Sequence, residues 1–303
     1  MTAALILVAG IVPDGSKRRP TDDIGGASSI KRLIMVFRHA GIRKIVVVTG
    51  SDAETIERHC AHMGVVFLRN DGYEAGDMLS SVKIGLDYLR DKCEKAFISP
   101  TDVPLFSSET VRSIQDMPEP AVIPICNNKT GHPILVSRSL FNRVLGYCGP
   151  GGLEGALSGS EVERRFLDVP DEGILVDTMS SADISSIAEK QGLRNIRPDA
   201  KIQLSGEKGF FGPGASLLLG LTQETGSLKQ AAKQMGVSYS KAIKMIAVIE
   251  EQLGYQILES QRGGSGGGSS LITKEGLDFM RRYEAFESEC KELIKCIYEK
   301  HFG

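Results

Sequence analysis

The apolar residues in the first two thirds of the chain follow two alternating patterns. Short segments such as AALILVAG, KIVVVTG and KAFISP are apolar almost throughout, without the polar–apolar alternation of a half-exposed strand. Between them, segments such as IKRLIMVFRHAG and LSSVKIGLDYLRDK carry apolar residues at helical spacing. Wholly apolar strands separated by amphipathic helices are typical of parallel strands covered on both faces. The pattern from residue 3 to about residue 190 therefore predicts an α/β fold with an open sheet.

The pattern changes near residue 195. Pro198, Pro213 and several glycine and aspartate residues interrupt the apolar runs, which indicates a boundary between two domains. A chain of 303 residues is also long enough for two domains. We therefore expect a first domain over residues 1–194, a linker and first hairpin region over 195–214, and a second domain over 201–303.

The second domain is predicted to be mainly α-helical. KIQLS and GFF are expected to form a small hairpin, and two short strands at 256–260 and 270–273 flank the glycine-rich stretch QRGGSGGGSS. Apolar spacing and flanking serine and glycine residues predict helices over 215–224, 228–235, 239–253 and 274–298.

The segment GSLKQAAKQMGVSYSKAIKMI has the pattern of a helix-turn-helix. Ser227 and Ser238 are placed to cap two helices, and Gly236 supplies the turn between them. From Ser227 to Lys244 there are four lysines and no acidic residue, so one local surface is cationic and suits DNA phosphates. Our candidates for DNA contact are Ser238, Tyr239, Lys241, Lys244 and, at the base of the glycine-rich hairpin, Arg262.

The composition of the whole chain limits the classes of function. With 36 basic and 38 acidic residues, the protein does not attract nucleic acid by its net charge, so DNA binding needs the local patch. The six cysteines include no CxxC pair, which favours a reducing compartment and a cytoplasmic protein. The apolar run at the start is too short to span a bilayer, and we expect no membrane association.

The helix-turn-helix tract, with the following RGGSGGGSSLITKEG, resembles the winged helix-turn-helix of ModE-type molybdate regulators over about residues 201–283. The resemblance implies binding to double-stranded DNA, with the helix from Tyr239 in the major groove and the glycine-rich hairpin as a wing. It also implies a homodimer through helices around 217–221 and 279–297, where apolar residues recur at near-heptad spacing. The alternative is a small helical domain for protein contact with a flexible Gly/Ser loop.

Three parts of the first domain carry chemistry, at the strand ends where α/β sheets bind ligands. The first is LVAGIVPDGSKRRP, a glycine-containing loop with three consecutive cations. Backbone amides and cationic side chains both match phosphate oxygens, although a charged surface loop would have the same composition. The nucleotide-binding candidates here are Gly10, Ser16, Arg18 and Arg19.

The second part, SPTDVPLF, holds Asp102 between two prolines after an apolar strand. A carboxylate in this place suits Mg²⁺ that bridges nucleotide phosphates, and the alternative is a turn-forming aspartate. Asp102, Arg18 and Lys17 are our candidates for catalysis, which would consist of positioning and charge neutralisation.

The third part consists of GDMLSSVKIGL and TGHPILVSR. Ser80 and Ser81 lie near a predicted helix start. Gly131 would let the chain pass close to a ligand and His132 would orient it, although a lone histidine is also common in cores. In HCAH, His59 and His62 lie three residues apart on one helical face, a spacing that metal ligands could use, but we favour a partly exposed helix face.

The order and spacing of these segments are similar to those of MobA-like nucleotidyltransferases. GDMLSSVKIGL, PTDVPL and GHPILVSR resemble molybdenum cofactor cytidylyltransferases of the MocA type, and the resemblance covers about residues 1–190. It implies a Rossmann-like nucleotidyltransferase sheet with flanking helices. The implied reaction joins a nucleoside monophosphate from CTP or GTP to a molybdopterin and releases pyrophosphate. Gly10, Ser16 and Arg18 would hold the nucleotide, Ser80 and Ser81 its base or ribose, and Gly131 and His132 the pterin.

The chain departs from this family in two places. Ser16 and Arg18 come four residues later than in the family's first loop, and Met179 stands where a late acidic run has its second aspartate. Asp177 matches the first aspartate of that run and is our second candidate for Mg²⁺, whereas a thioether is a poor ligand for this hard cation. Two hypotheses follow: an active transferase joined to a DNA-binding domain, or a transcriptional regulator whose transferase-like domain senses a nucleotide or molybdopterin without turnover. A scaffold without either ligand is a third.

Overall fold

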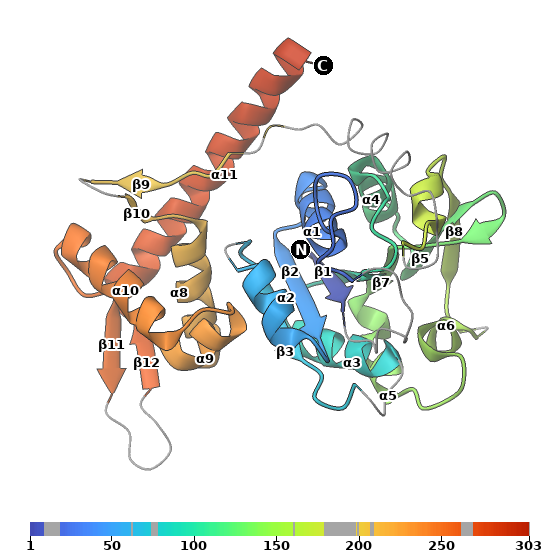
Figure 1. Cartoon of the computed structure of the whole chain (residues 1–303), viewed down its shortest axis with the longest axis horizontal. Coiled ribbons are helices and arrows are strands. Elements are labelled where there is room, and N and C mark those ends of the chain that lie inside the picture. The colour runs from blue at the N-terminus through green and yellow to red at the C-terminus, as the bar shows by residue number, and fades with distance from the viewer. Residues whose placement is uncertain are drawn as a thin grey trace. The chain divides into compact units, whose positions relative to one another are not determined.

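The computed structural model describes residues 1–8, 19–61, 63–73, 78–159, 161–178, 198, 200–206, 209–261 and 269–302. The chain divides into two compact units (Figure 1). Unit 1 comprises residues 1–60 and 65–196, and unit 2 comprises residues 61–64 and 197–303. None of the described helices is long and apolar enough to cross a membrane.

Unit 1 is built on a mixed sheet that joins eight of the described strands. Its first half is parallel, in the order β3-β2-β1-β4. The apolar runs of the sequence form these strands, and almost every side chain of β1 and β4 is buried, because helices cover both faces. The fold class predicted from the pattern is confirmed. The strands are β1 (Thr2–Leu7), β2 (Lys44–Thr49), β3 (Val66–Arg69) and β4 (Lys95–Pro100).

The second half of the sheet contains an antiparallel strand that the apolar pattern did not predict. Strand β7 (Ile134–Ser137) lies between β4 and β5 (Ala121–Cys126) and is antiparallel to both. Its first residue, Ile134, pairs with Ile98 near the end of β4. Residues just before β7 therefore lie at the same sheet edge as residues just after β4. The remaining strands are β6 (Lys129–Thr130) and β8 (Arg164–Asp168), which both pair with β5.

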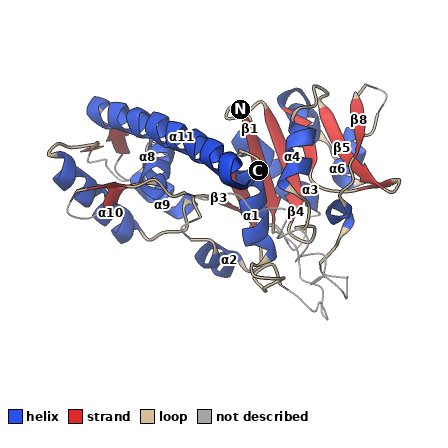
Figure 2. Ribbon diagram, turned by 90° about the horizontal axis from the view of Figure 1, so that it is seen from above, coloured by secondary structure: helices blue, strands red, loops and turns tan. Residues whose placement is uncertain are grey.

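Two groups of helices cover this sheet. Helix α1 packs against α4, and α3 packs against α5 and α6, and Figure 2 shows the strands side by side among these helices. The aromatic ring of Phe37 on α1 lies 5.6 Å from Phe97 and 5.7 Å from Phe106, so the core continues from the sheet into the segment after β4. The helical elements are α1 (Ser29–His39), α2 (Ala53–His59), α3 (Met78–Leu89), α4 (Ser108–Gln115), η1 (Arg138–Leu140), α5 (Phe141–Gly146), α6 (Gly152–Leu157) and η2 (Glu172–Leu175).

Unit 2 contains the helices and hairpins that its sequence predicts, with ends that differ by a few residues. The long helix α11 continues to Phe302, beyond the predicted end at 298, because its helical spacing and charged residues continue. The elements are β9 (Leu204–Ser205), β10 (Gly209–Phe211), α8 (Pro213–Thr225), α9 (Leu228–Gln234), α10 (Tyr239–Leu253), β11 (Leu258–Gln261), β12 (Ser269–Ile272) and α11 (Lys274–Phe302).

The local signals of the helix-turn-helix act as expected. The Ser227 hydroxyl accepts a hydrogen bond from the Gln230 amide at 3.4 Å, and the Ser238 hydroxyl accepts one from the Lys241 amide at 3.2 Å. Gly236 has a φ of 64°, a left-handed conformation that glycine adopts without strain. These caps and the turn position α9 and α10 against each other.

Candidate functional site

The two predicted Mg²⁺ ligands, Asp102 and Asp177, lie in neighbouring segments of unit 1. Thr178 donates two hydrogen bonds to the backbone carbonyl of Asp102, from its amide at 2.7 Å and from its hydroxyl at 3.1 Å. An apolar cluster of Ile24, Leu105 and Val176 packs the same segments together. The fold thus brings together two carboxylates that are far apart in the sequence, at the carboxyl end of β4.

The electrostatic environment of Asp102 does not favour an isolated negative charge. Burial raises the pKa of this half-buried carboxyl, and the negative charge of Asp177 raises it further, whereas the backbone amides of Asp102 and Val103 lower it through hydrogen bonds. The Oδ1 atom is shielded from solvent and has no hydrogen-bond partner in the described part of the chain. A buried oxygen of this kind is expected to bind a proton donor or a cation.

The donor set fits a hard divalent cation. Mg²⁺ prefers oxygen ligands, and the site offers two carboxylates, one of which has a buried oxygen without a hydrogen-bond partner among the described residues. Substrate phosphates and water would supply the remaining ligands. The described residues contain no cluster of three or more His, Cys, Asp or Glu side chains that could hold a metal without such help. His59 has another partner, because its Nε2 lies 2.8 Å from the Ser28 hydroxyl; His62 lies outside the described residues.

His132 is positioned at this sheet edge by the antiparallel strand β7. Its amide donates to the Ile174 carbonyl at 3.1 Å, and its ring forms a hydrogen bond with the backbone of Ile98. Burial lowers the pKa of His132 to about 4, although the bond to Ile98 opposes this shift. The ring is therefore neutral near pH 7. Its Nδ1 atom is shielded from solvent and lacks a hydrogen-bond partner in the part of the chain that the structure describes.

Gly131 has a structural reason for its small size. A Cβ atom at this position would collide with the backbone carbonyl of Ile174. Gly173 is similar, since a Cβ atom there would collide with the carbonyl of Leu105. In the structure the close approach at Gly131 is therefore to the chain itself, and contact with a ligand stays a prediction.

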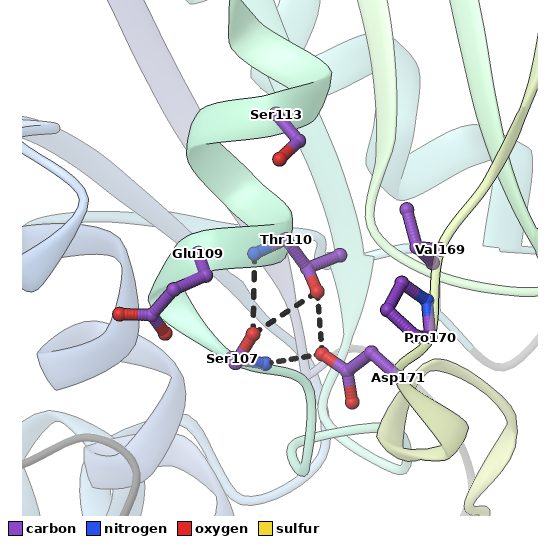
Figure 3. A pocket seen from close by; sticks show the side chains of 7 residues that line it. All are labelled: Ser107, Glu109, Thr110, Ser113, Val169, Pro170 and Asp171. Carbon is purple, nitrogen blue, oxygen red and sulfur yellow. Dashed lines mark hydrogen bonds between the residues drawn. The ribbon is translucent and has the colours of Figure 1, made fainter.

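Asp171 anchors the segment that carries Asp177, and its sequence context had not marked it. Its Oδ2 accepts hydrogen bonds from the Ser107 amide at 2.8 Å and the Thr110 hydroxyl at 2.5 Å, and its Oδ1 accepts one from the Gly173 amide at 3.0 Å. These bonds lie beside a shallow hollow of about 350 Å³ at the start of α4 (Figure 3). The buried carboxylate of Asp171 thus joins two segments of the chain through hydrogen bonds. These segments are far apart in the sequence, so only the fold places Asp171 beside Ser107.

Ser80 and Ser81 lie in the first turn of α3, and both contact Asn70. The Asn70 side-chain amide donates to each serine hydroxyl at 3.0 Å, and the Asn70 backbone amide donates to the Thr49 carbonyl at 2.8 Å. Ser81 is fully buried and Ser80 is half-buried. Asn70 was missed in the sequence, and its position directly after the apolar run VVFLR is the signal that could have found it. Contact of the two serines with nucleotide stays a prediction.

Most of the candidate phosphate-binding loop lies outside the described residues, namely Gly10, Ser16, Lys17 and Arg18. Arg19 is described and exposed, and its amide donates to the Asp22 carboxylate at 2.7 Å. The Asp23 carboxylate accepts from the amides of Gly25 and Gly26 at 2.8 and 2.7 Å. These two acidic side chains therefore form the turns that lead into α1. Met179 also lies outside the described residues.

In unit 2, the candidate DNA contacts lie on the first turns of α10. Ser238 caps the helix, and Tyr239, Lys241 and Lys244 are exposed. Ala242, Ile246 and Ile249 of the same helix are buried, so the opposite face of α10 is held in the core and the cationic face is open. Arg262 lies outside the described residues.

This fold is that of a nucleotidyltransferase-like domain joined to a helix-turn-helix domain. Residues 13–165 match the family model described as the MobA-like NTP transferase domain. The chain belongs to the family of proteins with this MobA-like NTP transferase domain.

Unit 2 matches a different family model from the one that its sequence suggested. Residues 220–277 match the bacterial regulatory helix-turn-helix protein, lysR family, so the ModE-type assignment is wrong. Capping serines, a turn glycine and small residues at the helix crossing are physical requirements of any helix-turn-helix. They indicate the fold and do not distinguish one family of regulators from another.

Individual relatives are similar to unit 1. A molybdenum cofactor cytidylyltransferase of Escherichia coli (strain K12) is 30% identical over 97 residues, 31% of this chain and 49% of that protein. The match thus spans about half the length of the curated relative. A nucleotidyl transferase from Methanothermobacter thermautotroptrophicus has a TM-score of 0.54 at 19% identity, covering 64% of this chain and 99% of that one. A 4-diphosphocytidyl-2C-methyl-D-erythritolsynthase from Anaerococcus prevotii DSM 20548 has a TM-score of 0.49 at 15% identity, covering 63% and 96%.

Proposed function

We propose that unit 1 transfers a nucleoside monophosphate from CTP or GTP to the terminal phosphate of a molybdopterin-type acceptor, with Mg²⁺ as cofactor. The observation that carries this proposal is the proximity of the Asp102 and Asp177 carboxylates, together with the buried Oδ1 atom of Asp102, which has no hydrogen-bond partner among the described residues. The family of the domain and the activity named for the Escherichia coli relative support the reaction and the acceptor.

The transfer needs no protein nucleophile. An acceptor phosphate oxygen forms a bond to the α-phosphorus while the bond from that phosphorus to the β-phosphate bridging oxygen breaks, and pyrophosphate leaves. Bound Mg²⁺ would neutralise charge on the phosphates. Asp102 and Asp177 would hold the cation, and the other residues would position substrates. In the proposal, Gly10, Ser16, Lys17, Arg18 and Arg19 contact the triphosphate, Ser80 and Ser81 the nucleoside, and Gly131 and His132 the acceptor.

The proposal is tested with the purified full chain, Mg²⁺, molybdopterin and either CTP or GTP, by measuring pyrophosphate release. Asp102→Asn should reduce the rate at least about a hundredfold, as loss of a charge-stabilising group does in other enzymes. Asp87→Asn is the matched control, because Asp87 is exposed on α3 and pairs only at the surface with Arg90 at 2.7 Å.

The same experiment separates the enzyme from a non-catalytic sensor. Nucleotide that raises the melting temperature of the wild-type chain in a Mg²⁺-dependent way, without pyrophosphate release, would contradict catalysis and support the sensor. Absence of both effects would contradict nucleotide binding altogether.

We propose that unit 2 binds double-stranded DNA as a transcriptional regulator. The observation that supports this function is the exposed face of α10 with Lys241 and Lys244, positioned by the Ser238 cap. A gel-shift assay with the DNA upstream of the chain's own coding sequence tests it. Lys244→Ala should weaken binding at every sequence and lower its salt dependence. Lys295→Ala on α11 is the matched control for the loss of one exposed lysine.

We further propose that the regulator is a homodimer, since helix-turn-helix domains commonly read paired half-sites. Exposed apolar side chains on α11 support a homodimer. Phe286, Leu293 and Ile297 are exposed by 47, 63 and 58%, and their spacing of seven and four residues follows a heptad pattern. A second copy of α11 would cover these side chains.

A further inference from the structure

Helix α10 exposes large apolar side chains to solvent, in addition to its lysines. Tyr239 is 48% exposed and Ile243 is 44% exposed. They lie four residues apart, and the exposed Ala247 follows after four more, so the three side chains form one stripe along the helix. Packing inside unit 2 does not require this stripe, because Ala242 and Ile246 of the same helix already face the core.

The exposed side of this helix offers both polar and apolar side chains to bases. Its first nine residues are YSKAIKMIA, with no arginine for guanine and no asparagine or glutamine for adenine, although a lysine can donate to both O6 and N7 of guanine. Ile243 and Ala247 can form no hydrogen bond through their side chains. Besides the serine, the tyrosine hydroxyl and the lysines, the exposed chemistry available for base discrimination is therefore apolar contact.

We infer that α10 recognises DNA through the C5-methyl groups of thymine, with Ile243 at the centre of the contact and Tyr239 and Ala247 on either side. This inference rests on the proposed DNA binding of unit 2. The thymine methyl is the apolar group that base pairs present in the major groove. Covering it removes apolar surface of both partners from water, which explains why an isoleucine occupies an exposed position.

The charge around the stripe favours DNA over a protein partner. Lys229, Lys233, Lys241 and Lys244 are all exposed, and the sequence from 227 to 244 contains no acidic residue. Exposed lysines on α9 and α10, together with an apolar stripe on α10, suit a polyanion with methyl groups in its groove. The lysines would contact phosphates and set the position of α10, while the stripe would choose among sequences.

The test begins with the full chain and a library of random DNA duplexes, from which bound sequences are enriched. In an enriched duplex, each thymine is then replaced in turn by uracil, which lacks only the C5-methyl group and keeps every hydrogen-bonding atom. We expect at least one replacement per half-site to weaken binding about fourfold, the effect of about one buried methyl group.

Ile243→Ala identifies the side chain that makes the contact. This variant should bind the thymine and uracil duplexes with nearly equal affinity at the position that Ile243 covers, since a double-mutant cycle isolates the coupling between the two groups. Met35→Ala is the matched control, because Met35 is 37% exposed on α1 of unit 1, and it should keep the full difference between the duplexes.

The outcomes separate the inference from the function on which it rests. Enriched duplexes whose affinity is unchanged by every uracil replacement would overturn methyl recognition and leave DNA binding intact. A chain that binds no duplex at all would overturn both, and the stripe would then be assigned to a protein partner. The uracil series uses the wild-type chain, so its result does not depend on the folding of any variant.

Discussion

The Thr178 hydroxyl donates a hydrogen bond of 3.1 Å to the backbone carbonyl of Asp102, beside the shorter bond from the Thr178 amide. Thr178, which directly follows the proposed cation ligand Asp177, thus holds the backbone of the other proposed ligand, Asp102. Because Thr178 is buried, water does not readily replace this bond.

Thr178→Val should loosen the pair of carboxylates without changing side-chain size. Loss of the hydroxyl should lower the free energy of unfolding by about 1 kcal/mol and weaken Mg²⁺-dependent nucleotide binding about fivefold, measured by calorimetry. Thr178→Ser keeps the hydroxyl and should retain the wild-type affinity. Equal affinities for the valine and serine variants would contradict this role of the hydroxyl.

His132 should make unit 1 sensitive to acid. Its pKa is lowered to about 4 in the folded chain and is about 6.5 in an unfolded chain, so the unfolded state binds the proton more tightly. The contribution of neutral His132 to the free energy of unfolding is therefore fully present above the pKa of the unfolded chain. It is lost as the pH drops from about 6.5 towards 4. Between pH 7 and pH 5 the loss should be on the order of 1–2 kcal/mol, measured by urea unfolding.

Substitution of His132 checks the source of that acid sensitivity. His132→Gln should flatten the dependence of unfolding free energy on pH in this window. His301→Gln, which changes an exposed histidine at the end of α11, should leave the dependence as in the wild type. A wild-type slope in the His132 variant would show that other groups cause it.

Gly173→Ala should damage the site through the backbone. The new methyl group would collide with the Leu105 carbonyl, which is main chain and cannot rotate away, so the segment leading to Asp177 must shift. We expect a loss of about 1–3 kcal/mol in unfolding free energy together with weaker Mg²⁺ binding. Gly146→Ala, where a Cβ atom meets no atom within 4 Å, should change neither quantity by a comparable amount.

Leu293→Glu should dissociate the proposed homodimer. A charge in the centre of an apolar helix seam is costly to bury, so the variant should sediment as a monomer at concentrations where the wild type is a dimer. Lys295→Glu changes an exposed residue of the same helix outside the heptad positions and should leave the dimer intact. A wild-type chain that is monomeric at micromolar concentration would refute the proposal itself.

The sequence by itself was enough for the fold class, for the parallel strands β1 to β4 and for the elements of unit 2, but not for the second half of the sheet. Wholly apolar runs become the buried parallel strands β1 to β4 because helices on both faces exclude water, and Ser227 and Ser238 become helix caps because that chemistry is local. It also marked Asp102 and His132, each of which stands next to a strand in a short motif.

Tertiary structure decided what these residues contact. Only the antiparallel insertion of β7 brings His132 to the end of β4 and leaves its Nδ1 buried, and only the return of the chain near residue 171 places Asp177 and Thr178 beside Asp102. Asn70 and Asp171 acquire their partners in the same way. Apolar periodicity reports which face of an element is buried, whereas the contacts of a polar side chain depend on segments distant in sequence, which no local pattern encodes.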